Sequence, residues 1–384
     1  MKRRTAPASI ATLAVRTNIG AAAQFAQFRC STPLWPLMST ARLLRGNVML
    51  MRNKLLSAAR RFGAGIDVSP REVRLVIVSR KGRSNLPVRV EWLGAAPLNP
   101  DAMSGAHLVD RAAVAAALSS LCARWPRRRA LRAMPCAMAI PGGATAIATF
   151  EMPPVTQAPD SYGRDSQAID EMEPIMLEQA ERLCGLERDA LSIDWWAADC
   201  AAASGETSAA DVSRVTLAAA PRRHLEARVE AAAAAGIALA AIDGEPLAAL
   251  RALAYAAEHS LRRADRYAAI WAGSDGVYGW RVADGAVEAS VRFPLGEHAD
   301  LDAALGSLAS GAGLDRALIG GDVKVLERLG LAMADIGERL GCPAEPFDCA
   351  PFCFDGGRFA PRAEAKQAGR FAVAFGLALR GVFE

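Results

Sequence analysis

The chain has 384 residues, of which 52% are apolar and 6% aromatic, and its formal net charge is +4. It is long enough to bury one large domain or two to three ordinary ones, which excludes a disordered chain. The sequence contains no run of about 18 uncharged apolar residues, so it predicts a globular protein without a membrane-spanning helix.

The charge is distributed unevenly along the chain. Residues 1–66 hold eleven Lys and Arg and no acid, whereas the other 318 residues hold 34 basic and 41 acidic residues. A basic leader therefore precedes a mildly acidic body, which is not the signature of a nucleic-acid-binding domain. We expect the leader, 1–61, to be disordered, or residues 1–48 to lie upstream of a true start at Met49 or Met51. An alternative is a short basic amphipathic helix over Met51–Arg61 that lies on anionic lipid.

The eight cysteines are scattered and have no nearby histidine pair. This pattern predicts reduced, packed thiols and no metal site.

The first third of the body predicts a strand meander followed by a helix. Phe62–Val78 has the pattern of a strand, a tight turn with Asp67, and a second strand. The expected elements are strands Val73–Ser79 and Val88–Leu93, a helix over Asp110–Ala123, and strands Ala137–Ile140 and Thr145–Met152.

A small α+β unit is expected next. A long acidic helix starts at Asp165, Pro174 should kink it or mark a fresh start, and Gly185 is expected to end it in the left-handed conformation. Strands at Leu191–Ala197 and Val212–Ala219 complete the unit.

The pattern of the opening then returns. A helix over Pro221–Ala235 and a strand over Ile237–Ile242 lead to Asp243, which we expect to cap a helix that runs to about Arg263. A second meander follows, with strands at Tyr267–Ala272, Val277–Ala283 and Val287–Phe293. This approximate duplication predicts a two-lobed mixed α/β (α+β) architecture.

Several short segments, in collinear order, carry a family resemblance. They are Gly65–Asp67 with Val73–Val76, Ala139–Gly142, Glu171–Pro174, Leu217–Arg222, Val229–Ala232, Ala235–Ile237, Ile242–Glu245, Ile319–Gly321 and Phe371–Arg380. In this order they resemble the actin-like PilM proteins of type IV pilus assembly, also called the competence protein family.

The resemblance implies an actin-like (ribonuclease H-like) fold with an inserted small subdomain and a reduced second lobe. It predicts the first lobe at 62–144 and 221–264, the insertion at 145–220 and the shortened second lobe at 265–384. It also implies a cytoplasmic protein of type IV pilus biogenesis and twitching motility, held peripherally at the inner membrane by the N-terminal tail of a bitopic PilN-like partner. Other pilus platform proteins and a homo-oligomer are further possible contacts, and no nucleic acid is expected.

Family members that bind ATP use two phosphate turns, each with an Asp followed by small residues. In the first turn here, Asp67 is followed by Ser69, Pro70, Arg71 and Glu72, so one N–H is missing and a negative charge is added.

The second turn aligns on Gly273, which puts Trp271 where the acid should be and leaves Asp275 as the nearest carboxylate. The adenosine segment keeps Gly320 and Gly321 but continues with Asp322. The interval between Gly296 and Gly320 is too short for the subdomain that forms one wall of the nucleotide cleft in the family.

These changes predict a degenerate nucleotide site, no ATP hydrolysis and no catalytic residue or cofactor, with Asp67 reduced to a turn cap. The leading hypothesis is a pilus scaffold whose partner peptide lies in a groove near Phe150, Met152, Glu171 and Glu173. One alternative is an actin-like ATPase that binds ATP and Mg²⁺ and assembles under nucleotide control. Another is a type II secretion platform component.

Overall fold

The computed structural model describes most of the body of the chain. The described residues are 60–81, 86–127, 131, 133–152, 165–198, 213–262, 264–294, 301–311, 313–328, 331–353 and 368–383. The predicted leader lies outside them except for Arg60 and Arg61, which begin the first strand rather than ending a helix. Among the described residues, no helix is both long enough and apolar enough to cross a membrane.

The first lobe is built on a five-stranded sheet with the order β10-β6-β1-β2-β3. Its strands are β1 (Arg60–Val68), β2 (Glu72–Lys81), β3 (Arg89–Pro97), β6 (Cys136–Ile140) and β10 (Ala241–Gly244). The first three form an antiparallel meander, whereas β6 and β10 run parallel to β1. Strand β10 begins later than predicted, because residues 237–240 turn before they join the sheet.

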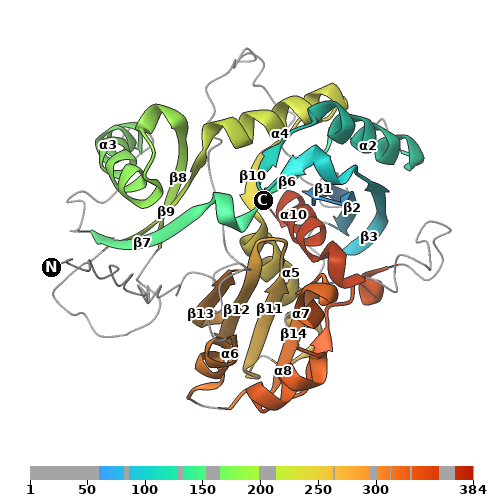
Figure 1. The fold of residues 1–384 in the computed structure, drawn as a ribbon, viewed down its shortest axis with the longest axis vertical. Coiled ribbons are helices and arrows are strands. Elements are labelled where there is room, and N and C mark those ends of the chain that lie inside the picture. The colour runs from blue at the N-terminus through green and yellow to red at the C-terminus, as the bar shows by residue number, and fades with distance from the viewer. Residues whose placement is uncertain are drawn as a thin grey trace, which may run out of the picture.

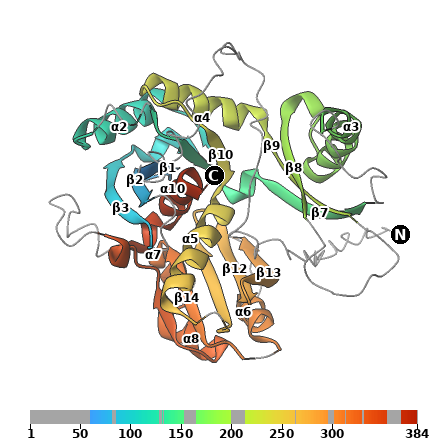
Figure 2. The ribbon, with the colours of Figure 1, turned by 180° about the vertical axis from the view of Figure 1, so that it is seen from behind.

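The second lobe repeats this order in a sheet β13-β12-β11-β14-β15. Its strands are β11 (Tyr267–Ala272), β12 (Gly276–Ala283), β13 (Ala286–Pro294), β14 (Arg316–Gly321) and β15 (Ala344–Pro346). Again a meander is followed by two strands parallel to its first strand. The predicted duplication is confirmed. Figure 1 shows the two lobes above and below one another, and Figure 2 shows the same arrangement from behind.

Helices cover the outer faces of both sheets. The first lobe carries α2 (Arg111–Arg124) and α4 (Arg222–Ala234), with a small ribbon of β4 (Met103–Ser104) and β5 (His107–Leu108). The second lobe carries α6 (Leu301–Ala309), α7 (Val323–Arg328) and α8 (Met333–Leu340). Between β13 and β14 the described residues contain only α6, which fits the predicted shortening of this lobe.

Two helices lie between the sheets and join the lobes. Helix α10 (Ala372–Phe383) packs on β1 and β2 of the first sheet, and α5 (Glu245–Ser260) packs on β11 and β14 of the second. The two helices also pack on each other, so one hydrophobic core runs through both lobes. The predicted division assigns α5 to the first lobe and α10 to the second; α5 contacts strands of both sheets, and α10 packs mainly on the first sheet.

Close approach of α10 to the first sheet explains a glycine in the opening motif. A Cβ at Gly65 would overlap the carbonyl oxygen of Ala374, so only glycine lets α10 lie against β1 at this point.

The inserted unit has its own small core. Its antiparallel sheet has the order β7-β9-β8, from β7 (Ala146–Met152), β8 (Leu191–Ala198) and β9 (Ser213–Pro221), and α3 (Asp165–Cys184) covers one face. Helix α3 is continuous through Pro174, so the predicted fresh start is wrong, whereas Gly185 ends the helix with φ +64° as expected. In Figure 1 the unit stands to one side of the first lobe.

Candidate functional site

The sequence-predicted residues converge between the lobes. The β1–β2 turn, the loop after β6 and the start of α5 meet the β11–β12 turn of the second lobe there. We call this region the interlobe site and define it by Asp67, Glu72, Gly143, Glu245 and Asp275.

Asp67 lies at the end of β1, with only 2% of its surface exposed. Its carboxylate accepts a hydrogen bond of 2.7 Å from the guanidinium of Arg74, its cross-strand partner. Burial raises the pKa of Asp67 above its ordinary value, and the charge of Arg74 opposes that rise. The expected turn cap is therefore replaced by a buried ion pair, which already provides the cation that a metal would bring.

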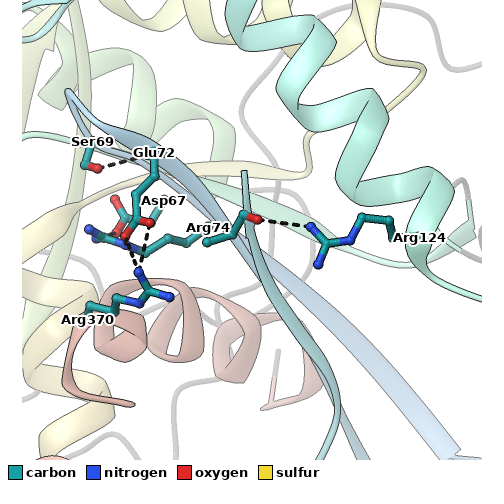
Figure 3. Close-up of polar contacts among 7 residues, drawn as sticks. Asp67, Ser69, Glu72, Arg74, Arg124 and Arg370 are labelled. Atoms are coloured by element: carbon teal, nitrogen blue, oxygen red, sulfur yellow. Dashed lines mark hydrogen bonds and ion pairs between the residues drawn. The ribbon is translucent and has the colours of Figure 1, made fainter. Parts of the chain in front are cut away.

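The ion pair extends into a network. Arg74 Nε donates to Glu72 at 2.6 Å, and Arg370 from the short turn before α10 donates to both oxygens of Glu72, at 3.0 and 3.2 Å. Figure 3 shows Asp67, Glu72, Arg74 and Arg370 gathered on one side of the strands. Glu72 thus binds protein cations instead of facing an empty phosphate position.

The first turn is closed on itself. The backbone N–H and the hydroxyl of Ser69 both donate to the carbonyl oxygen of Glu72, at 3.0 and 2.9 Å. The carbonyl oxygen of Arg71 accepts a hydrogen bond from the backbone N–H of Leu98, and the side chain of Arg71 is exposed. Pro70 has no N–H, and the N–H of Ser69 is used within the turn. Neither residue therefore offers a free backbone donor to a phosphate.

The second turn reaches across to the first lobe. Gly273 N–H donates to the carbonyl oxygen of Gly276, and the Asp275 carboxylate accepts from the Tyr278 hydroxyl at 2.8 Å. The same carboxylate oxygen of Asp275 accepts from the backbone N–H of Gly143 in the loop after β6. The two lobes therefore touch directly at the level of the phosphate turns.

Trp271 and the two glycines of β14 belong to the shared core. Trp271 is 4% exposed and pairs with Gly320 across the sheet. Gly320 lies against Trp271 and Ala372, and Gly321 takes a φ of +101° and lies against the backbone of Ala272. Both glycines thus lie against packed residues of the shared core.

Two buried residues of the interlobe site escaped sequence reasoning. Arg228 on α4 has no exposed surface, and it donates to the carbonyl oxygens of Ala139, Ala106 and His224 at 2.8 to 3.1 Å. Burial lowers its pKa to about 10, while the charges of Glu245 and Asp67 act in the opposite direction. Its position on the apolar, alanine-lined face of α4 is the sequence feature that indicates a buried arginine.

Glu245 is the second of these residues. It is 4% exposed at the start of α5, and burial raises its pKa well above the ordinary value, with further repulsion from Asp67 and Asp275. The interlobe site thus combines four carboxyl groups, those of Asp67, Glu72, Glu245 and Asp275, with the buried guanidinium groups of the adjacent Arg74 and Arg228.

Asp243 forms ion pairs with arginines of α5 and α10 and is not the N-cap of α5. The N-cap of α5 is Gly244, and Asp243 accepts from the Gly244 N–H and from Arg251 at 2.9 Å, with Arg380 of α10 at 3.6 Å. The prediction that Asp243 caps α5 is wrong, because these ion pairs occupy its carboxylate.

The structure describes the side chains of two of the four residues expected near the partner groove. Phe150 on β7 packs into the core of the inserted unit, and Glu173 on α3 is exposed. The side chains of Met152 and Glu171 lie outside the described residues. The described part of the chain contains no group of three His, Cys, Asp or Glu side chains that could hold a metal ion.

Two sheets of the same order, bridged by a pair of central helices with a subdomain inserted in the first lobe, define an actin-like fold. The family model for the type IV pilus assembly protein PilM matches residues 65–270, more than half of the chain. The chain therefore belongs to the PilM family of type IV pilus assembly proteins.

One solved structure supports the fold, and two more distant ones are similar in part. A chain of a PilM-PilN type IV pilus biogenesis complex is similar, with a TM-score of 0.61 and 19% identity over 83% of this chain and 98% of that one. A protein with an actin-like ATPase fold from Bacteroides thetaiotaomicron VPI-5482 has 10% identity over 82% of this chain and 97% of its own, with a TM-score of 0.40.

The cytoplasmic domain of EpsL, an inner membrane component of the type II secretion system of Vibrio cholerae, has 10% identity over 68% of this chain and 82% of its own, with a TM-score of 0.35. The last two scores are too low to support an argument about function. No curated protein sequence matches the chain.

Proposed function

We propose that this protein is a scaffold of the type IV pilus inner-membrane platform that binds the N-terminal cytoplasmic peptide of a PilN-like bitopic protein and does not hydrolyse ATP. Its family and the similarity to a chain of a PilM-PilN complex support the partner. The protein is cytoplasmic in this proposal and is held peripherally at the inner membrane by that partner.

The main support for the absence of ATP hydrolysis is that the interlobe site is closed. Phosphoryl transfer needs free backbone donors around the phosphates and a carboxylate that holds a hydrated Mg²⁺. Here Ser69 donates within its own turn, Asp67 is paired with Arg74, and Asp275 contacts Gly143 across the lobes. Nucleotide would have to break all three arrangements to enter.

The inserted unit offers a place for the peptide. Within the described residues, β7 forms hydrogen bonds only with β9, so its other edge is open to strand addition. Phe150 faces α3, and Ile147, an odd number of residues away, lies on the opposite face of the sheet. An extended peptide along β7 would therefore contact the half-buried Ile147.

Two titrations of the full chain test the proposal. Isothermal titration calorimetry with a synthetic peptide of the partner's N-terminal cytoplasmic residues is expected to show saturable binding, whereas Mg-ATP is expected to give no heat and no phosphate release. Tight Mg-ATP binding without peptide binding would establish the nucleotide-controlled alternative instead. Tighter binding of the corresponding peptide from a type II secretion partner would contradict the pilus assignment.

A matched pair of variants locates the peptide. Ile147→Lys is expected to weaken peptide binding at least about tenfold, because it puts a charge under the added strand. Ile175→Lys, on the exposed side of α3, is the control and should bind as the parent protein does. Circular dichroism melts of both variants verify that they fold. Equal affinities in the two folded variants would exclude β7 as the binding edge.

A further inference from the structure

Five basic residues gather at one end of the first sheet. They are Arg60 and Arg61 at the start of β1, Arg80 and Lys81 at the end of β2, and Arg89 at the start of β3. We call this cluster the basic end. The connection between β2 and β3 leaves the same end of the sheet, so the five residues lie together at this end of the lobe. Their side chains alternate between the two faces of the sheet, with Arg60 and Lys81 on one face and Arg61 and Arg80 on the other.

The register places like charges directly opposite one another. Arg60 pairs with Lys81, and Arg61 pairs with Arg80. Like charges in directly opposed positions destabilise an antiparallel pair. Two successive pairs of this kind make the sheet end less stable than neutral residues would, so a bound anion would stabilise it.

Within the described residues, acids neutralise only part of the basic end. Glu91 accepts from Arg60 at 2.6 Å and lies 3.6 Å from Arg89. Glu258 on α5 is a second nearby acid, and its charge and that of Arg80 both act on Tyr255. Among the described residues, no acid forms an ion pair with Arg61 or Lys81, and both side chains are exposed.

Two exposed apolar side chains border the basic end. Leu86 in the β2–β3 connection is 68% exposed, and Phe383 at the end of α10 is 39% exposed. The guanidinium of Arg80 lies 4.3 Å from the centre of the Phe383 ring. Apolar tips beside long basic side chains match the interface of a bilayer, where the tips enter the acyl boundary and the charges meet lipid phosphates.

We propose that the basic end of the first lobe binds an anionic phospholipid surface directly. Each basic residue near such a surface adds attraction to acidic headgroups, and Leu86 and Phe383 add apolar contact. Nucleic acid fits less well, because Arg80 lies over the Phe383 ring, which therefore offers no free platform for base stacking. This surface acts independently of the peptide site on the inserted unit.

Vesicle flotation of the full chain without its partner tests this proposal. Vesicles of phosphatidylglycerol and phosphatidylcholine in equal parts are expected to bind the protein, whereas phosphatidylcholine alone is not. In the double variant Arg61→Gln/Lys81→Gln, the partition coefficient should fall about fivefold per charge, or about 25-fold. Leu86→Ser should lower it several-fold on the anionic vesicles.

A control variant and a stability measurement complete the design. Arg182→Gln/Arg223→Gln removes two exposed charges from α3 and α4 and should bind within about twofold of the parent protein, since it leaves the basic end intact. Urea unfolding of Arg61→Gln/Lys81→Gln should show no loss of stability, because the variant removes like-charge pairs.

Three results would overturn the proposal. They are unchanged vesicle binding by the double variant, equal binding to neutral vesicles, and tighter binding of a DNA or RNA oligonucleotide that the same two substitutions weaken.

Discussion

Replacing Arg74 with methionine is expected to lower the free energy of unfolding by about 3 to 4 kcal/mol at pH 7. Removing one partner of a buried ion pair costs about 3–5 kcal/mol, because the other charge stays buried without compensation. The Arg74 and Asp67 side chains are 12% and 3% exposed, which places the pair at the buried end of that range.

Protonation of Asp67 sets the upper limit of the stability loss in the Arg74→Met variant. An unpaired Asp67 can take up a proton, which at pH 7 costs about 1.36 kcal/mol for each pH unit above the ordinary pKa of 3.8, or about 4 kcal/mol. At pH 5 the same limit is about 1.6 kcal/mol. The destabilisation should therefore shrink by more than half between pH 7 and pH 5.

Urea unfolding of the full chain at both pH values measures this effect. The double variant Asp67→Asn/Arg74→Met should recover about 2 kcal/mol relative to Arg74→Met alone, because it removes the buried charge. Arg124→Met is the control, since Arg124 is exposed and donates to the carbonyl oxygen of Ala95, and it should stay within about 0.5 kcal/mol of the parent protein.

A loss below about 1 kcal/mol at pH 7, or an equal loss at both pH values, would refute the ion-pair reasoning. Addition of Mg-ATP gives a further test. If Asp67 were a metal ligand blocked by Arg74, Mg-ATP would stabilise the Arg74→Met variant by mass action. We expect no such stabilisation.

Three further predictions concern the interlobe site and the shared core. The pKa of Glu245 is raised in the folded state, so the contribution of this residue to stability falls as the pH rises above 4.5. The Glu245→Gln variant should therefore unfold at a higher urea concentration than the parent protein at pH 8. This difference should vanish toward pH 4.5. Arg228→Met should cost about 3–5 kcal/mol in urea unfolding, because it leaves buried carbonyl oxygens and carboxyl groups without their cation; a cost below about 1 kcal/mol would contradict this. A Cβ at Gly376 would overlap the backbone of Ala248, so Gly376→Ala should lower stability by about 1–3 kcal/mol, whereas Gly306→Ala, which meets open space, should not; equal effects would argue against a close α5–α10 contact.

Local sequence patterns were sufficient to predict most elements and the duplication. The strands of both meanders alternate or run apolar over five to ten residues, and Gly185 marked the end of α3. The strand β10 was placed too early because alanines at 238, 240 and 241 fit either a strand or a connection. Residues 237–240 instead turn toward the sheet.

The network at the interlobe site was beyond reach of local patterns. Arg370 meets Glu72 across 298 residues of sequence, and Asp275 meets Gly143 across 132. Trp271 is an obstacle in the predicted second turn, and the structure gives its ring a place in the core that joins the lobes. Contacts of this kind depend on how the lobes pack, which no single segment encodes.

The position of α10 between the sheets also bears on how the protein folds during its synthesis. Strand β1 ends at Val68, but the helix that covers its inner face begins only at Ala372, more than 300 residues later. A nascent first lobe would therefore carry an uncovered apolar face while the inserted unit and the second lobe are translated, and domain-by-domain folding is not open to it. We expect this lobe to depend on chaperone binding until α10 leaves the ribosome.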